Sequence, residues 1–169
     1  MVSDEALMVE FQRGSRQAFE QLFARYQGPL FGFFARRLAA RERAEDLTQE
    51  TFLAVIHATA RYEPRATVRT YLYAIAIKLL AAERRKQRPV AIEIEPVVAG
   101  NADDVLWVRE ALARLDDRDR EILMLREYEQ LSYSEIAALL DLPVNTVRSR
   151  LFRSRLALKN QLEPAKHEA

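Results

Sequence analysis

The chain has 169 residues, which is enough for one domain or two small ones, and 49% of them are apolar, so it can bury a core. It contains no cysteine and only two histidines, which excludes disulfides, thiolate metal sites and histidine-rich metal sites. The net charge of only +1 identifies no partner, because binding to phosphates depends on where the charges lie rather than on their sum.

The charges are arranged in blocks along the chain. Residues 1–88 hold 15 basic and 10 acidic side chains, and residues 144–169 hold six and two. Between these ends, residues 89–104 hold four acids and no base, and residues 105–143 hold five bases and nine acids. Two basic blocks around an acidic middle are compatible with nucleic-acid binding through local cationic patches.

Several classes of function are excluded by missing patterns. The sequence has no glycine-rich phosphate loop, no HExxH and no plausible Ser/His/Asp set, so we expect no catalytic residue, no metal, no cofactor and no enzyme activity of its own. The N-terminal residues lack a basic-then-apolar signal pattern, and no apolar run approaches the length of a membrane span. A cytoplasmic protein without membrane insertion is therefore expected.

The scarcity of glycine and proline favours helices from the start of the chain. Residues 4–26 fit a pair of amphipathic helices with a break at Gly14-Ser15. A third helix is predicted from about Pro29, which suits a first helical turn, to about Leu38.

Residues 41–62 predict a longer helix with two unlike faces. The inner face is apolar and consists of Leu47, Phe52, Val55 and Ile56. The opposite face is acidic or polar and consists of Glu42, Glu45, Asp46, Gln49 and Glu50. On composition alone, this second face is typical of a solvated surface.

A proline-containing loop, Tyr62 to Thr70, leads into a helix from Thr70 to Gln87 that ends in a basic turn. Its inner side chains are expected to be Leu72, Ile75, Ala76, Leu79 and Leu80. Residues 89–104 contain two prolines and are interpreted as a mostly extended or mobile linker, with a short strand as the alternative. Helices then resume at about 104–115 and 117–129.

The C-terminal part fits two short helices joined by a tight turn. Ser132 and Glu135 form a capping-box pattern at the start of the first helix, and Pro143 follows its end. The second helix carries an apolar stripe of Val144, Val147, Leu151, Leu158 and Leu162. Its other side is cationic and hydrogen-bonding, with five basic and no acidic residues between 144 and 162, and such a helix suits the major groove of DNA. The pattern leaves open whether Phe152 and Leu156 pack inward or face solvent.

Two motifs together resemble a known family. The segment AEDLTQETF (44–52), followed by LSYSEIAALLDLPVNTVRSRLFRSR (131–155), is similar to the sigma-70 family and looks most like its extracytoplasmic-function (ECF) group. The resemblance implies an all-α chain of two small helical domains: sigma domain two (1–88) and the helix-turn-helix sigma domain four (105–169), joined by a flexible linker (89–104). It also implies a subunit that binds bacterial core RNA polymerase, directs it to promoter DNA and is held by an anti-sigma factor or another regulator.

The resemblance assigns three sets of candidate residues. The candidates for binding core polymerase are Glu45, Asp46, Gln49, Glu50 and Phe52. The candidates for holding the opened strand of the −10 element are Tyr62, Tyr71, Lys78, Arg84, Arg85, Lys86 and Arg88. The candidates for reading the −35 duplex are Asn145, Thr146, Arg148, Ser149, Arg150 and Arg153.

Some assignments keep an alternative. Arg150 suits a phosphate contact or a salt bridge, and Tyr71 and Tyr73 suit core packing as well as base stacking. The chain also departs from the common family pattern in the −10-reading helix and at the last helix: Tyr71 replaces Trp, Ile77-Lys78 replaces Arg-Asn, Ala82 replaces Asp, and Asn145 replaces Gly.

Two other functions compete with the polymerase subunit. The chain could be a free-standing helix-turn-helix regulator, although such a protein does not need AEDLTQETF or a basic, aromatic helix in its first half. It could instead be a decoy that binds polymerase and opens no promoter, as the departures at Lys78 and Ala82 would suggest.

Overall fold

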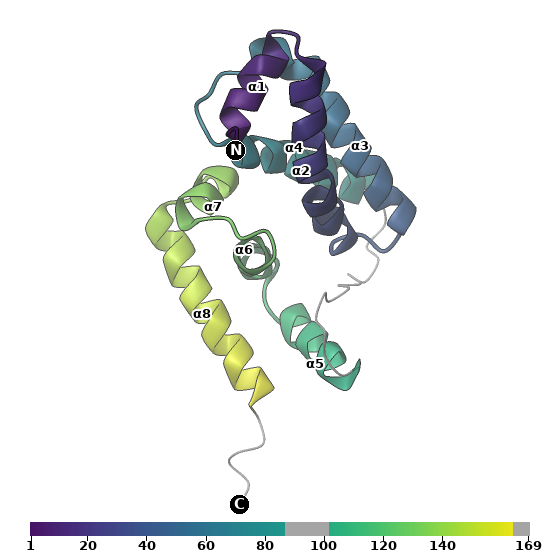
Figure 1. Ribbon diagram of the computed structural model, residues 1–169. Coiled ribbons are helices and arrows are strands. Elements are labelled where there is room, and N and C mark those ends of the chain that lie inside the picture. The colour runs from purple at the N-terminus through teal and green to yellow at the C-terminus, as the bar shows by residue number, and fades with distance from the viewer. Residues whose placement is uncertain (87–101, 164–169) are drawn as a thin grey trace, which may run out of the picture. The chain divides into compact units, whose positions relative to one another are not determined.

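The computed structural model describes residues 1–86 and 102–163, with side chains from Leu106 onward in the second range. Every regular element in these ranges is a helix, which confirms the all-α prediction (Figure 1). The chain divides into two compact units, Met1–Glu93 and Ile94–Ala169. Most of the predicted linker, its alternative strand and the candidate Arg88 lie outside the described residues.

The described part of unit 1, residues 1–86, consists of four α-helices and one 3-10 turn: α1 (Asp4–Gln12), α2 (Arg16–Ala35), α3 (Arg41–Ala58), η1 (Thr59–Arg61) and α4 (Val68–Lys86). The side chains of Ser3 and Ser15 accept hydrogen bonds from backbone N–H groups in the first turns of α1 and α2. Gly14 between them has a φ of 103°, a left-handed conformation that favours glycine, so the predicted break occurs where the sequence places it.

The predicted third helix starting at Pro29 is wrong, because α2 continues through Pro29 to Ala35. A proline normally forces the preceding residue out of helical geometry by a clash with that residue's Cβ. Here the preceding residue is Gly28, which has no Cβ, so the helix can pass through. Fully buried Phe33 and Phe34 beyond the proline then hold the added turns in the core.

The core of unit 1 brings together side chains from all four helices. Its largest fully buried members are Met8, Leu30, Phe33, Phe34, Leu47, Val68 and Tyr73. Ile56 is the exception to the predicted inner face of α3, since it is 40% exposed. It lies nine residues after Leu47, which is half a turn away on the helical wheel and therefore on the opposite side.

Helices α3 and α4 are also joined by an ion pair. The Arg43 guanidinium donates to both carboxylate oxygens of Glu83, at 2.8 Å from Nε and 2.7 Å from the second nitrogen. Glu83 is buried, and this bidentate geometry is the strong form of an arginine–carboxylate contact. The pair fixes the end of α4 that carries the basic residues.

Unit 2 consists of α5 (Ala102–Ala113), α6 (Asp117–Glu127), α7 (Tyr133–Leu140) and α8 (Val144–Leu162). The predicted capping box is confirmed: the Ser132 hydroxyl accepts from the Glu135 N–H at 3.1 Å, and the Glu135 carboxylate accepts from the Ser132 N–H at 3.0 Å. Buried Arg120 holds the turn after α5 by donating to the carbonyls of Leu112 and Leu115, each at 3.0 Å. These contacts fix the turn between α5 and α6 and the start of α7.

Candidate functional site

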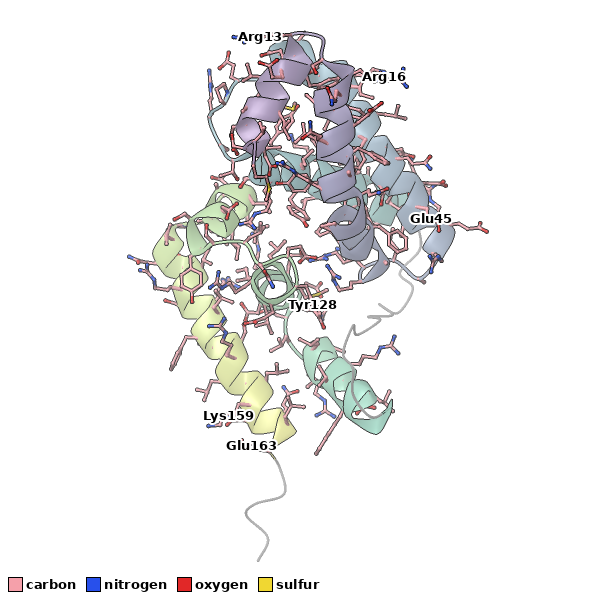
Figure 2. All side chains as sticks on the ribbon, viewed as in Figure 1. Arg13, Arg16, Glu45, Tyr128, Lys159 and Glu163 are labelled. Carbon is pink, nitrogen blue, oxygen red and sulfur yellow. The ribbon has the colours of Figure 1, made fainter. Side chains whose placement is uncertain are left out.

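The acidic face of α3 lies on the surface of unit 1. Glu45, Asp46, Gln49 and Glu50 are all exposed, and Glu45 projects away from its helix (Figure 2). Asp46 accepts a hydrogen bond from Arg43 at 3.0 Å, which leaves more than half of its side chain accessible. The face can therefore meet a basic partner without any change in the fold.

The candidate Phe52 does not lie on that face. It is 4% exposed and packs with Phe23 and Phe19, at ring-centre distances of 4.8 and 6.2 Å. Its helical position is one turn from buried Thr48, which is on the inner side of α3. Phe52 therefore supports the surface from beneath and cannot itself be a contact anchor.

The apolar anchors beside the acidic face are residues that the sequence analysis missed. Leu53 and Ile56 are 52% and 40% exposed on α3, and Phe23 of α2, which packs against Phe52, is 37% exposed. A shallow pocket of about 250 Å³ lies at the edge of the same face, lined by Phe23, Gln27, Phe31, Arg41, Glu45, Thr48 and Gln49. Charge around a few apolar side chains is the composition expected of a protein-binding surface. The helical periodicity of the sequence could have shown that these two side chains are exposed, because Leu53 and Ile56 fall on a different side of the helical wheel from buried Leu47.

A second pocket, of about 480 Å³, opens where η1 leads into α4. It is lined by Ala58, Arg61, Tyr62, Glu63, Arg65 and Tyr71. We call these six residues the loop pocket. The rings of Tyr62 and Tyr71 meet edge to face with centres 5.1 Å apart and form its aromatic wall. Tyr73 is instead fully buried against Phe33, so the structure separates two tyrosines that the sequence could not.

The loop pocket combines neutral phenols with cations. Burial raises the pKa of the Tyr62 hydroxyl, and the nearby Glu5 carboxylate raises it further. Burial also raises the pKa of Tyr71, against the opposing effect of Arg61. Both phenols are thus protonated donors at neutral pH. The buried Tyr62 hydroxyl has no hydrogen-bond partner among the residues that the structure describes.

The basic end of α4 extends from the loop pocket along the same helix. Lys78, Arg84, Arg85 and Lys86 are exposed there. Ile77 and Ala82, where the sequence departs from the family pattern, are half-buried. The acid nearest to Ala82 is Glu83, which pairs with Arg43.

Helix α8 presents most of its predicted polar face to solvent. Asn145, Arg148, Ser149 and Arg153 are exposed, whereas Thr146 is half-buried. Arg148 donates to the Asn145 side chain at 3.1 Å, and its guanidinium lies 5.8 Å from the centre of the Tyr133 ring. These contacts hold the arginine near the N-terminal turns of the helix, where major-groove readers place their base contacts.

Two further arginines of α8 are engaged within unit 2. Arg150 donates to Asp119 at 2.9 Å, so of the two roles suggested for it, phosphate contact or salt bridge, the structure shows the salt bridge. Arg155 donates to Glu127 at 2.7 Å. Phe152 and Leu156 are 69% and 47% exposed, which resolves the question left by the helical wheel. Lys159 lies one turn before the end of the described helix (Figure 2).

The described residues, 1–86 and 102–163, contain no group of three or more His, Cys, Asp or Glu side chains able to hold a metal ion. Within the same ranges, no helix is long and apolar enough to cross a membrane.

The two units are those of a helical protein with a helix-turn-helix in its second half, and comparison with known proteins agrees. The family model for sigma-70 region 2 matches residues 22–90, and the model for sigma-70 region 4 matches residues 106–158. The chain is 31% identical to the RNA polymerase sigma-H factor of Pseudomonas aeruginosa, over 98% of this chain and 97% of that protein. It is also 31% identical to the ECF RNA polymerase sigma-E factor of Escherichia coli K12, over 96% of each.

Solved structures show the same architecture. CnrH, solved in complex with the cytosolic domain of CnrY, superposes with a TM-score of 0.73 at 25% identity, over 96% of this chain and 99% of that one. The sigma factor RpoE of Bartonella quintana, solved with the anti-sigma factor NepR, gives 0.71 at 23% identity, over 88% and 98%. The chain belongs to the sigma-70 family and within it to the ECF group. Members of this family are transcription initiation factors, so the chain is not an enzyme in its own right.

Proposed function

We propose that the chain binds bacterial core RNA polymerase and directs initiation at specific promoters. The observation that carries this is the occurrence, in one chain, of an acidic docking face, an aromatic and basic pocket, and an exposed cationic reading helix. A free-standing regulator needs the last of these and not the first two. Residues 1–88 would act as sigma domain two and residues 105–169 as sigma domain four.

The polymerase would dock on α3. Its exposed Glu45, Asp46, Gln49 and Glu50 offer negative charge and hydrogen-bond acceptors, and Leu53 and Ile56 offer apolar area beside them. Complementary charge mainly sets the rate and the orientation of such docking, and the apolar anchors supply much of the affinity.

The opened strand of the −10 element would be held by α4 and the loop pocket. A base turned out of the stack could lie against half-buried Tyr71, which the largely buried Tyr62 ring supports edge to face, while Arg61 and Arg65 meet its phosphates. Lys78, Arg84, Arg85 and Lys86 would follow the backbone along α4. Stacking on an aromatic wall contributes about 1–3 kcal/mol per base.

The −35 duplex would be read by the N-terminal half of α8. Arg148 and Arg153 are the candidates for contacts to guanine, with Asn145 and Ser149 beside them. Arg150 is paired with Asp119, so its contribution to reading would be to hold α8 against α6. Asn145 would place an amide where the family commonly has a glycine.

A protein regulator is the other proposed partner. CnrH was solved with the cytosolic domain of CnrY, which supports a similar protein partner for this chain. The family resemblance implies that such a partner is an anti-sigma factor that holds the chain away from polymerase.

Transcription in vitro tests the proposed function directly. Purified core polymerase, the full chain and a library of promoter fragments should give specific run-off products that define both promoter elements. Binding to core polymerase without any product would favour the decoy. Neither binding nor product would favour a free-standing regulator.

A further inference from the structure

The loop pocket is held in place by a helix that does not line it. Among the six residues around the pocket, none comes from α1. Helix α1 also precedes the segment matched by the region 2 family model, which begins at residue 22. Yet two side chains of α1 bind the backbone on both sides of the loop between η1 and α4.

Gln12, the last residue of α1, binds the start of this loop. Its side-chain nitrogen donates to the carbonyl of Thr59 at 3.0 Å and to the carbonyl of Tyr62 at 3.1 Å. A primary amide has two N–H donors, so both are used on one short stretch of backbone. These bonds fix the η1 turn that carries Arg61 and Tyr62.

Glu5, near the start of α1, binds the other end. Its carboxylate accepts a hydrogen bond from the Val68 N–H at 3.0 Å. This N–H belongs to the first turn of α4, which has no partner for it within the helix and carries a partial positive charge. A carboxylate is therefore well suited to fix the first turn of α4, which carries Tyr71.

Helix α1 is itself firmly attached. The Asp4 carboxylate accepts from Arg25 of α2 at 2.6 Å and also from the Tyr26 hydroxyl. Leu7 and Met8 are buried in the core of unit 1. Helix α1 is thus anchored on one side and holds both ends of the loop on the other.

We propose that Gln12 and Glu5 are positioning residues for the captured base: they order the loop pocket so that Tyr62 and Tyr71 form a preformed wall. This inference rests on the proposed role of the pocket in holding a −10 base. Neither residue touches the nucleotide, and both act by setting the backbone that carries the residues that do. Preformed geometry avoids the loss of loop freedom on binding.

The test uses the full chain assembled with core polymerase and a single-stranded DNA selected by this holoenzyme from a randomised pool. Each position of the selected strand is replaced in turn by an abasic site. The dissociation constant of the abasic strand divided by that of the intact strand measures how much the base at that position contributes to binding. Gln12→Glu keeps the size of the side chain and removes both donors. We expect it to lower the ratio at the captured position at least about fivefold, as loss of two ordering hydrogen bonds implies. Glu5→Gln keeps an oxygen that can accept from the Val68 N–H but removes the negative charge, so it should lower the same ratio by a smaller factor. Gln12→Lys, which restores an N–H donor, should recover part of the loss seen in Gln12→Glu.

A purely structural effect gives a different result. Partial unfolding weakens the intact and abasic strands alike and leaves their ratio unchanged. Gln17→Ala on α2 and Glu10→Gln on α1 change exposed residues of the same types and should leave the ratio at the wild-type value. A full wild-type ratio in both Gln12→Glu and Glu5→Gln would overturn the inference. A wild-type chain with no abasic-sensitive position would instead overturn the pocket's proposed role, and the inference with it.

Discussion

The Tyr62 phenol is buried without a hydrogen-bond partner among the described residues, an arrangement that costs folding free energy. The Tyr26 hydroxyl, also in unit 1, is in the opposite situation, because it donates to the Asp4 carboxylate. The hydroxyl groups of these two tyrosines thus make opposite contributions to the free energy of folding.

Removing the Tyr62 hydroxyl should therefore not weaken the fold. We expect Tyr62→Phe to leave the free energy of unfolding unchanged or to raise it by up to about 1–3 kcal/mol, and Tyr26→Phe to lower it by about 1.5–3 kcal/mol. Denaturant titration of the full chain measures both. A clear loss of stability in Tyr62→Phe would show that its hydroxyl has a partner within the fold.

The raised pKa of Tyr62 adds a dependence on pH. In the unfolded chain this phenol ionises near its ordinary pKa of 10.0, whereas in the folded chain its pKa is higher because of burial and Glu5. The neutral form is therefore favoured by folding, so its contribution to stability is complete below about pH 10 and is lost as the pH rises toward the folded pKa. Tyr62→Phe should lack this part of the alkaline loss.

Helix α8 shows which buried residues an amphipathic pattern predicts and which it does not. The apolar stripe predicted Val147 and Leu151 as buried, and both are. The pattern did not predict that Ser154 is also fully buried. Its hydroxyl donates to the Arg150 carbonyl at 2.6 Å. A serine hydroxyl can donate to a backbone carbonyl one turn earlier in its own helix, so a serine can be buried without an unsatisfied polar group.

The exposed arginines of α8 carry the prediction for duplex recognition. Arg148→Ala or Arg153→Ala should weaken binding to the −35 duplex by about 1–3 kcal/mol if the side chain contacts a base. Arg118→Ala removes the same charge from an exposed position on α6 and serves as the control. Fluorescence anisotropy with labelled duplex measures all three. Wild-type affinity in both α8 variants would remove this helix from the reading role.

The acidic face of α3 carries the prediction for polymerase docking. Reversal of charge in Asp46→Arg with Glu50→Arg should abolish association with core polymerase, because both side chains are exposed and would face a basic partner. The fold should persist, since Arg43 keeps its bidentate contact with Glu83.

The matched control for α3 is Glu10→Arg with Glu20→Arg. These acids are exposed on α1 and α2, and their reversal makes the same change in net charge. Association is measured by pull-down on immobilised core polymerase, and thermal unfolding checks each variant. Retained binding in the α3 variant would contradict the docking assignment.

Each of the two units has its own core and its own capped helices. Fully buried Phe33 and Tyr73 belong to unit 1, and fully buried Ile122 and Leu151 belong to unit 2. A unit with a complete core can fold without the rest of the chain. The two recognition tasks proposed above should therefore be separable.

Fragments 1–93 and 94–169 should each unfold cooperatively when made alone. The first should retain binding to core polymerase and the second should retain weak binding to duplex DNA. Circular dichroism during heating and pull-down measure these outcomes. A first fragment that fails to fold would show that unit 1 depends on unit 2.

The local patterns of this sequence determined most of its helices, the Ser132–Glu135 cap, the turn before α8 and the acidic face of α3. Each depends on side chains within a few residues of one another, where spacing translates directly into geometry. The paired motifs AEDLTQETF and LSYSEIAALLDLPVNTVRSRLFRSR by themselves indicate the sigma-70 family.

Only the tertiary structure decided which of several equivalent side chains face the core. It placed Tyr73 inside and Tyr71 at the pocket, buried Phe52, exposed Leu53 and carried α2 through Pro29. It also brought Gln12 to Thr59 and Glu5 to Val68, pairs separated by 47 and 63 residues. Such contacts depend on how helices pack across the unit, and no periodicity along one helix contains that information.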